Sequence, residues 1–335
     1  MDGSKLLRFK RAFQPNSVES TSKGWVLLLK WSALLAVFSY LAYKLLTFNQ
    51  YDEFVAHWKQ MPLLQFWWLV GVFVLLPLNW WLESVKWKLL VSKVQKINSL
   101  NSLKAVLVGI STGFLTPNRV GELVGRVMFL HAENRKGGVT LSLLNSLTQN
   151  IIMVLCGVPA CVLFFNASKG NFEMNVTLYL AVLLASLLVF GLIYFMLPEL
   201  SRRFKQSRCS DKIKDFTNCL SCYNKPDLLQ IMFISLGRYL VFCTQFFFML
   251  RFFCVELSGW QALIAIPTTY LFVTFTPSLA FSDAAVRSSY AVLVIGVFSG
   301  QVVNVALASL LIWAVNLVIP LLVGSVLLIR KSASL

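Results

Sequence analysis

Acidic side chains and histidines are scarce in this sequence, and so are the arrangements that enzymes make of them. Of 335 residues, 14 are Asp or Glu and 2 are His. We find no acidic pair suited to a metal ion, no nucleophile–base pair and no glycine-rich phosphate loop with a lysine. Cys219 and Cys222 form a C-x-x-C, but no second cysteine pair or histidine cluster follows to indicate zinc. We therefore expect no catalytic residues, no cofactor and no metal.

Charged residues of both signs make up only 13% of the chain, well below their share in soluble proteins. Hydrophobic residues reach 57%, and the mean hydropathy is +0.71. One membrane crossing requires about 20 apolar residues. Apolar segments of this order lie near 25–47, 63–85, 139–165, 177–197, 228–254 and 303–329. The predicted fold class is an all-α polytopic membrane protein with about six full spans.

The net charge of +16 is unevenly distributed along the chain. Basic residues gather at 5–23, 86–104, 135–136, 202–225 and 330–331. The other loops, at 48–62, 166–176 and 255–262, have only two lysines. By the positive-inside rule, this asymmetry places both termini in the cytoplasm. Topology and attraction to anionic lipid account for the charge, so we do not expect nucleic acid as a partner.

Two stretches about 160 residues apart share an unusual set of residues. Residues 116–126 are Thr-Pro-Asn-Arg-Val-Gly-Glu-Leu-Val-Gly-Arg, and residues 276–287 are Thr-Pro-Ser-Leu-Ala-Phe-Ser-Asp-Ala-Ala-Val-Arg. Each begins with Thr-Pro and continues to an acid that is followed, four positions later, by an arginine. Charges within apolar sequence are costly and usually functional. A duplicated broken-helix signature of this kind is typical of a transporter's substrate site.

The basic segments determine how these two stretches enter the membrane. Because 86–104 and 135–136 both belong inside, residues 105–130 must form a re-entrant hairpin from the cytoplasmic face. Residues 260–300 follow a span that ends outside and precede one that begins outside, so they form a second hairpin from the opposite face. The segments 63–165 and 228–329 are then inverted repeats, whose broken helices meet near the membrane midplane.

The predicted organisation is one transmembrane domain at residues 25–330. It follows a basic cytoplasmic tail at 1–24, which lacks the short apolar core and cleavage site of a signal peptide. An amphipathic cytoplasmic linker at 198–227 separates the two repeats, and residues 331–335 form the cytoplasmic end.

The tips of the two predicted hairpins have the chemistry of an anion site. Thr116-Pro117 and Thr276-Pro277 are typical helix starts, because Thr is a good N-cap and Pro is favoured at the first helical position. A helix start presents free N–H groups and a positive dipole end. The alternative interpretation is that each Thr-Pro only kinks a helix.

Arginines predominate among the charged residues of these segments. Arg119, Glu122 and Arg126 are spaced to share one helix face. Further candidates for the site are Asp283 and Arg287 on the second hairpin, mid-span Arg238, and the polar residues Asn145, Gln149 and Gln245. The four arginines and two acids give a net charge of +2, which suits a phosphate. The acid–arginine pairs could alternatively neutralise each other.

The motif Thr116-Pro117-Asn118-Arg119-Val120-Gly121-Glu122, followed by Arg126, resembles the signature of the lysylphosphatidylglycerol synthase transmembrane-region family. The resemblance covers roughly residues 25–330. It implies a flippase-like, lipid-translocating domain with two re-entrant hairpins, and it implies Arg119, Glu122 and Arg126 as site residues. Because no aminoacyl-transferring domain follows before Leu335, the resemblance is to a stand-alone member, from which we expect no lipid synthesis.

Three functions compete at this point. The leading hypothesis is a flippase or scramblase for a phosphate-bearing lipid (a phospholipid, an aminoacyl-phospholipid or a polyprenyl phosphate) in the bacterial cytoplasmic (inner) membrane. The alternatives are a secondary transporter of a small anionic solute and, least favoured, an intramembrane lipid-modifying enzyme. The expected partners are membrane lipids with an anionic headgroup. A homo-oligomer and a partner lipid-synthesising enzyme are both compatible with the sequence.

Overall fold

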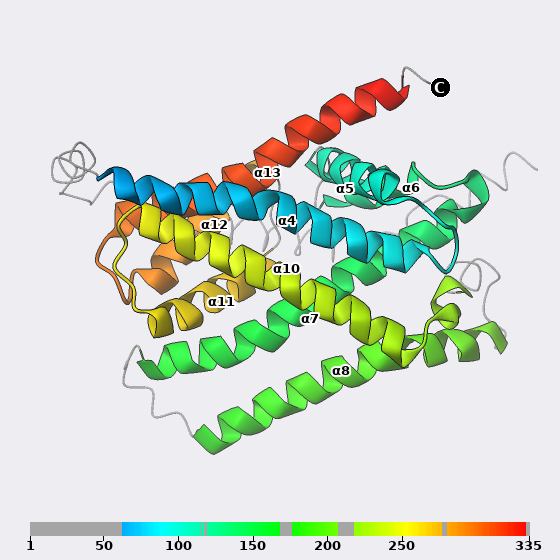
Figure 1. The fold of residues 1–335 in the computed structure, drawn as a ribbon. Helices are drawn as coiled ribbons and strands as arrows, with labels where there is room; N and C mark the ends of the chain where they lie inside the picture. Colours follow the sequence, from blue (N-terminus) through cyan, green and yellow to red (C-terminus); the bar gives the residue numbers. More distant parts are fainter. Residues whose placement is uncertain are drawn as a thin grey trace, which may run out of the picture.

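The computed structural model describes residues 62–114, 116, 119–167, 176–206, 218–276 and 280–332. Within these residues every regular element is a helix, as predicted (Figure 1). The elements up to the middle of the chain are η1 (Leu63–Gln65), α4 (Phe66–Val91), α5 (Ser99–Phe114), α6 (Gly121–Val127), η3 (Ala132–Asn134), α7 (Arg135–Ala167) and α8 (Val176–Gln206). They are followed by η4 (Asn218–Cys222), α10 (Lys225–Phe252), α11 (Gly259–Phe275), α12 (Ala280–Ile295) and α13 (Val302–Ser332).

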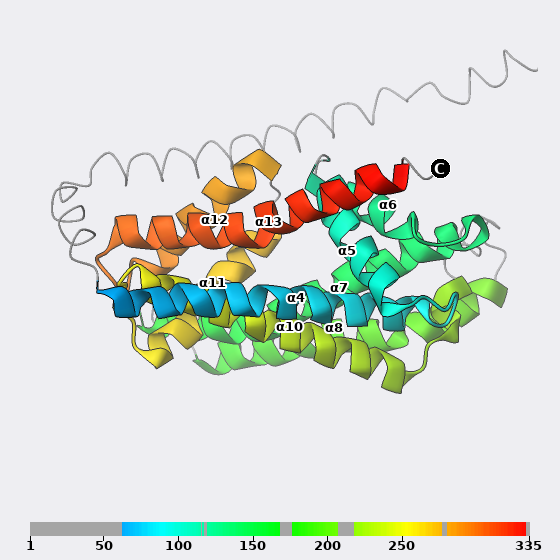
Figure 2. The same ribbon diagram turned by 45° about the horizontal axis from the view of Figure 1, so that its top comes forward.

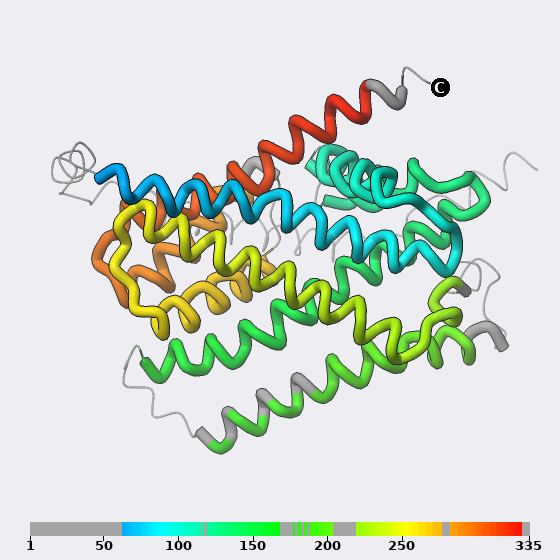
Figure 3. Tube along the Cα trace, in the orientation of Figure 1, coloured from blue at the N-terminus to red at the C-terminus, as the bar shows by residue number. Residues whose placement is uncertain are grey.

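Four helical segments of the described residues are long and apolar enough to cross a membrane. They are Leu63–Val91, Ala132–Ala167, Lys225–Phe252 and Val302–Ile329. These segments confirm four of the predicted spans, and Figure 3 traces the chain through them. The predicted span at 177–197 lies within α8, which continues through Pro198 to Gln206 and so includes the start of the predicted linker. The predicted span at 25–47 and the N-terminal tail lie outside the described residues.

The long helices are mostly apolar, on their outer surfaces as well as on the faces that pack inside the protein. Large apolar side chains on their outer surfaces are exposed, for example Trp67 and Trp81 on α4 and Leu322 on α13. Local sequence also determines where helices begin. Capping boxes open α10 (Asn224 with Asp227) and α11 (Ser258 with Gln261).

Two helical hairpins lie at opposite ends of the long helices, α5–α6 at one end and α11–α12 at the other (Figures 1 and 2). Their helices have 16, 7, 17 and 16 residues, each shorter than the about 20 that a full crossing requires. The last long helix of each half of the chain packs on the hairpin of the other half: α7 packs on α11, and α13 packs on α5.

Glycine permits the close approach of α6 to α5. A Cβ atom at Gly121 would lie 2.2 Å from the carbonyl oxygen of Thr112, and one at Gly125 would lie 2.1 Å from the Thr112 hydroxyl. That hydroxyl donates a hydrogen bond to the Gly121 carbonyl at 2.8 Å. The two arms of the first hairpin are therefore so close at Gly121 and Gly125 that a side chain on either glycine would overlap Thr112.

Two apolar cores occupy the two ends of the crossing between α4 and α10. One contains Val72 and Leu76 of α4 together with the last turns of α10, and α11, α12 and α13 pack around it. The other contains Trp87 and Leu90 of α4 together with the first turns of α10, and α5 and α7 pack around it. The middle of both helices belongs to neither core. This is where the polar residues of the molecule gather.

Candidate functional site

A cavity of about 590 Å³ lies between the two apolar cores, and both hairpins reach it. Side chains from α4 to α7 and from α10 to α13 line it. Among the described residues, seven that line the cavity are charged: Glu83, Arg119, Glu122, Arg126, Arg238, Asp283 and Arg287. Four arginines against three acids leave one net positive charge. The candidate residues predicted from the sequence give +2, because Glu83 is not among them.

Glu83 on α4 is the centre of the charged network, although its side chain is only 1% exposed. One carboxylate oxygen accepts from Arg126 at 2.6 Å and from Asn145 at 2.7 Å. The other lies 2.8 Å from a guanidinium nitrogen of Arg238 and 3.1 Å from the Lys86 ammonium. Four helices, α4, α6, α7 and α10, therefore meet on a single carboxylate. Glu83 was not among the candidate site residues predicted from the sequence.

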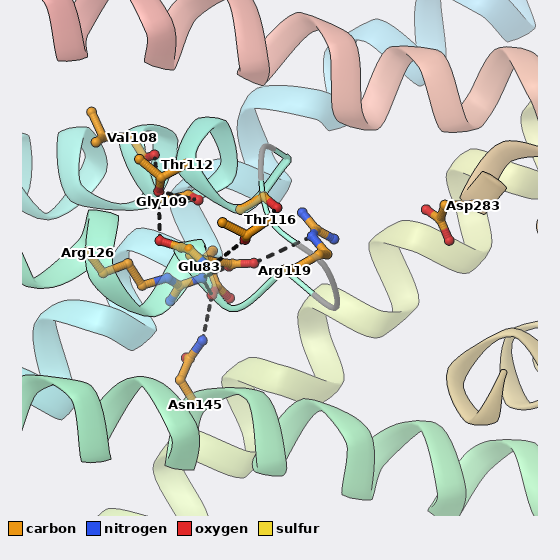
Figure 4. A network of polar contacts seen from close by, with 12 residues as sticks. Glu83, Val108, Gly109, Thr112, Thr116, Arg119, Arg126, Asn145 and Asp283 are labelled. Carbon is orange, nitrogen blue, oxygen red and sulfur yellow. Dashed lines mark hydrogen bonds and ion pairs between the residues drawn. The ribbon is translucent and has the colours of Figure 1, made fainter. Parts of the chain in front are cut away.

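The first hairpin supplies three charged residues, which differ in how strongly the protein holds them. Arg126 is 3% exposed and is bound by both Glu83 and Glu122. Arg119 is 47% exposed, and its Nε atom lies 3.7 Å from Glu122. In Figure 4 Arg126 and Asn145 converge on Glu83, and Arg119 lies between this cluster and Asp283. Arg119 is thus the arginine of this hairpin that a ligand can reach.

The predicted start of the first half-helix is wrong. α6 begins at Gly121, and Arg119 precedes it with a left-handed backbone (φ 57°). The Thr116 hydroxyl accepts from the Gly121 N–H at 2.7 Å and donates to the Gly113 carbonyl. Because this first N–H is occupied, Thr116 stabilises the turn and does not open an anion site. Pro117 lies outside the described residues.

Arg238 connects the charged network to α13. It lies at the centre of α10, and its Nε atom donates to Asn79 on α4 at 2.8 Å. Asn79 in turn donates to Asn316 on α13 at 3.4 Å. The Arg238 guanidinium also lies 5.0 Å from the ring centre of Phe242, a favourable cation–π distance. These contacts hold Arg238 in place, so it is a fixed part of the cavity wall.

The second hairpin presents a smaller pair of charges. Arg287 donates to Asp283 at 3.0 Å, one turn away on α12, and Trp313 of α13 donates to the same carboxylate oxygen at 3.1 Å. The Arg287 side chain is 30% exposed. Thr276 lines the cavity but is the C-cap of α11, bonded to Phe272 and Tyr290, and not the predicted start of α12. Pro277 lies outside the described residues.

Of the three polar candidates on the spans, two line the cavity. Asn145 binds Glu83, and Gln149 accepts from Lys86 at 3.4 Å. Gln245 does not share this site. It is fully buried between α10 and α4, where it donates to the Val72 carbonyl at 3.1 Å. This is the helix–helix hydrogen bond that polar residues in membrane helices often make.

Metal-binding arrangements are not found among the described residues: no group of three or more His, Cys, Asp or Glu could hold an ion there. Burial raises the pKa of the Cys219 thiol to about 11, which keeps it protonated at neutral pH. Cys219 therefore lacks the lowered pKa that marks a reactive cysteine.

The long apolar helices and the charged cavity between them define a polytopic membrane protein with an internal polar site. Residues 26–324 match the lysylphosphatidylglycerol synthase transmembrane region, and the chain belongs to this family. Comparison with curated proteins and with solved structures gives no match.

Proposed function

We propose that the protein is a lipid flippase or scramblase, in which the headgroup of a phosphate-bearing lipid enters the cavity while its tails stay in the bilayer. The observation that carries this proposal is the set of four arginines around one cavity of about 590 Å³. That volume is within the range of about 300–1,000 Å³ typical of ligand sites. A net positive cavity within membrane helices requires an anion or water for balance.

The arrangement of the two halves supports alternating access to such a site. We propose that α4–α7 and α10–α13 are inverted repeats and that the two short-helix hairpins are re-entrant from opposite faces. The exchange of α7 onto α11 and of α13 onto α5 is what a two-fold relation between the halves would produce. The cavity then lies between the repeats, where transporters of this architecture bind substrate.

Two of the four arginines are available to a phosphate in the described structure. Arg126 and Arg238 are held by Glu83, whereas Arg119 and Arg287 are 47% and 30% exposed. They belong to different hairpins. A phosphate bound by both would therefore bridge the two halves of the protein, and its passage would be coupled to their relative movement.

The basic tail and loops favour a bacterial cytoplasmic membrane location with both termini inside. We assign the protein a transport role and propose that a separate enzyme supplies the lipid.

The test is leaflet exchange in proteoliposomes of a fluorescent phosphatidylglycerol, measured by dithionite quenching. One charge-assisted hydrogen bond contributes about 1.5–3 kcal/mol, so Arg119→Ala and Arg287→Ala should each slow exchange by about 10- to 100-fold. The matched control is Arg203→Ala at the end of α8, where the side chain is 73% exposed and pairs with Glu199 outside the cavity. Equal rates in the wild type and both cavity variants reject the site. Uptake of a water-soluble organic phosphate without lipid exchange would favour the solute transporter instead.

A further inference from the structure

The two carboxylates beside the first hairpin, Glu83 and Glu122, are already paired with cations of the protein. Glu83 is bound by Arg126, Arg238 and Lys86, and Glu122 is bound by Arg126 and approached by Arg119 at 3.7 Å. An ammonium group on a ligand would have to displace one of these cations to reach either acid. Since Arg126 is itself 3% exposed, its displacement would leave a buried guanidinium unpaired, which is costly.

Asp283, the acid on the second hairpin, is also paired within the protein. One oxygen of Asp283 accepts from both Arg287 and Trp313. All three acids among the described lining residues are thus engaged, and this described lining carries one net positive charge. A headgroup with one negative charge neutralises this lining. A headgroup whose ammonium groups give it a net positive charge is repelled by it.

A stripe of polar residues on α7 gives the cavity a second, uncharged recognition surface. Ser146 and Asn150 are one turn apart, line the cavity and are exposed, although they lie inside a membrane-crossing helix. Within the described part of the chain neither side chain has a hydrogen-bond partner. The side-chain Oδ1 atom of neighbouring Asn145 is buried and likewise lacks a partner among the described residues. Unpaired polar groups at such depth are costly unless a polar ligand or water satisfies them.

The chemistry of this stripe indicates its ligand. A hydroxyl and a carboxamide both donate and accept hydrogen bonds, so they match hydroxyl groups, which also do both. They provide no negative charge for an ammonium.

We propose that the cavity selects a lipid whose phosphodiester headgroup carries hydroxyl groups and no cationic substituent, with Ser146 and Asn150 as the residues that recognise the hydroxyls. This inference rests on the proposed function and deepens it. It sets this chain apart from what its family's name suggests, because a lysyl ester on the headgroup would add the ammonium groups that the cavity disfavours.

The experiment compares three fluorescent lipids in the leaflet-exchange assay: phosphatidylglycerol, phosphatidylpropanol and lysylphosphatidylglycerol. Phosphatidylpropanol has the same charge as phosphatidylglycerol but lacks its two free hydroxyls. Two neutral hydrogen bonds correspond to about a tenfold preference, so wild-type exchange of phosphatidylpropanol should be about tenfold slower. Exchange of lysylphosphatidylglycerol should be slower by about tenfold or more.

Two variants separate recognition from a general loss of activity. In Ser146→Ala/Asn150→Leu, exchange of phosphatidylglycerol should fall to the phosphatidylpropanol rate, while the phosphatidylpropanol rate is unchanged. Asn150→Asp keeps the shape of the side chain and adds an acid with no cation of its own. It should raise the rate of lysylphosphatidylglycerol relative to phosphatidylglycerol. The control is Leu147→Ala, which changes an exposed residue of the same helix outside the cavity lining and should leave all three rates unchanged.

The outcomes distinguish the two proposals. Equal wild-type rates for phosphatidylglycerol and phosphatidylpropanol would overturn the hydroxyl selection, and faster exchange of lysylphosphatidylglycerol would overturn the charge selection. In both cases the flippase proposal stands as long as the two arginine variants still slow exchange. No exchange of any of the three lipids by wild-type protein would overturn both.

Discussion

Replacing Glu83 with Gln tests whether one buried carboxylate organises the cavity. The substitution keeps the size of the side chain and removes its charge. Arg126 still pairs with a second acid, Glu122. Lys86 and Arg238 do not, because Glu83 is the only carboxylate of the described residues within 4 Å of either. Two cations, one of them fully buried and the other 19% exposed, would then face each other without compensation.

The size of the effect follows from this burial. Removing one partner of a buried ion pair costs about 3–5 kcal/mol, because the remaining charge is left uncompensated. We therefore expect Glu83→Gln to lower the free energy of unfolding by at least about 3 kcal/mol. Adding Lys86→Met removes one of the two orphaned cations. The double variant should recover about 1–3 kcal/mol relative to Glu83→Gln alone, which is the coupling expected of neighbouring charges.

The assay is unfolding by SDS titration in mixed micelles, followed by tryptophan fluorescence. Glu199 offers a matched control, since it also pairs with two arginines, Arg202 and Arg203, but at 3.6 Å and with a side chain that is 51% exposed. Exposed ion pairs contribute less than about 1 kcal/mol, so Glu199→Gln should change little. If Glu83→Gln is as stable as Glu199→Gln, or if adding Lys86→Met destabilises it further, the carboxylate does not organise the site.

Two further predictions concern packing. Gly125→Ala should destabilise the protein by about 1–3 kcal/mol in thermal unfolding, because the new methyl group would overlap the Thr112 hydroxyl. The control Gly191→Ala, whose new Cβ atom would have no atom within 4 Å, should be neutral or slightly stabilising. Gln245→Leu should lower the free energy of unfolding, because its hydrogen bond to the Val72 carbonyl is lost. The rate of lipid exchange per folded protein should be unchanged. A change in lipid preference would place Gln245 in the site.

Those features of the fold that depend on composition were predictable. A membrane span is recognised from the length and hydropathy of a single segment, so four spans were predicted close to their observed bounds. The charged residues of the motifs were also conspicuous, because charges are rare in such sequence. Arg119 and Arg287, 168 positions apart in the sequence, do line one cavity, and their role in binding stays a prediction.

Features that depend on tertiary contacts were not predictable. The Thr-Pro pairs have the local preferences of helix starts, but the contact of Gly121 with Thr112 moves the start of α6 beyond them. Thr276 likewise ends a helix, because its hydroxyl bonds back to Phe272. At Thr116 packing against the other arm of the hairpin outweighs the capping preference, and at Thr276 a hydrogen bond within α11 does so.

Glu83 was missed because three of its four partners, Arg126, Asn145 and Arg238, come from other helices. A signal was nevertheless present in the sequence: Asn79, Glu83 and Lys86 are spaced four and three residues apart, which places three polar side chains on one face of an apolar helix. Such a polar face indicates partners inside the protein more strongly than a position at the membrane surface.

The central claim is that both hairpins contribute to one headgroup site, and native mass spectrometry of lipids retained by the purified protein tests it most directly. We predict that each wild-type chain retains one phosphodiester lipid, and that Arg119→Ala and Arg287→Ala each reduce the occupancy of that same lipid. Two retained lipids, each lost in only one of the variants, would contradict a shared site, and so would full retention in both.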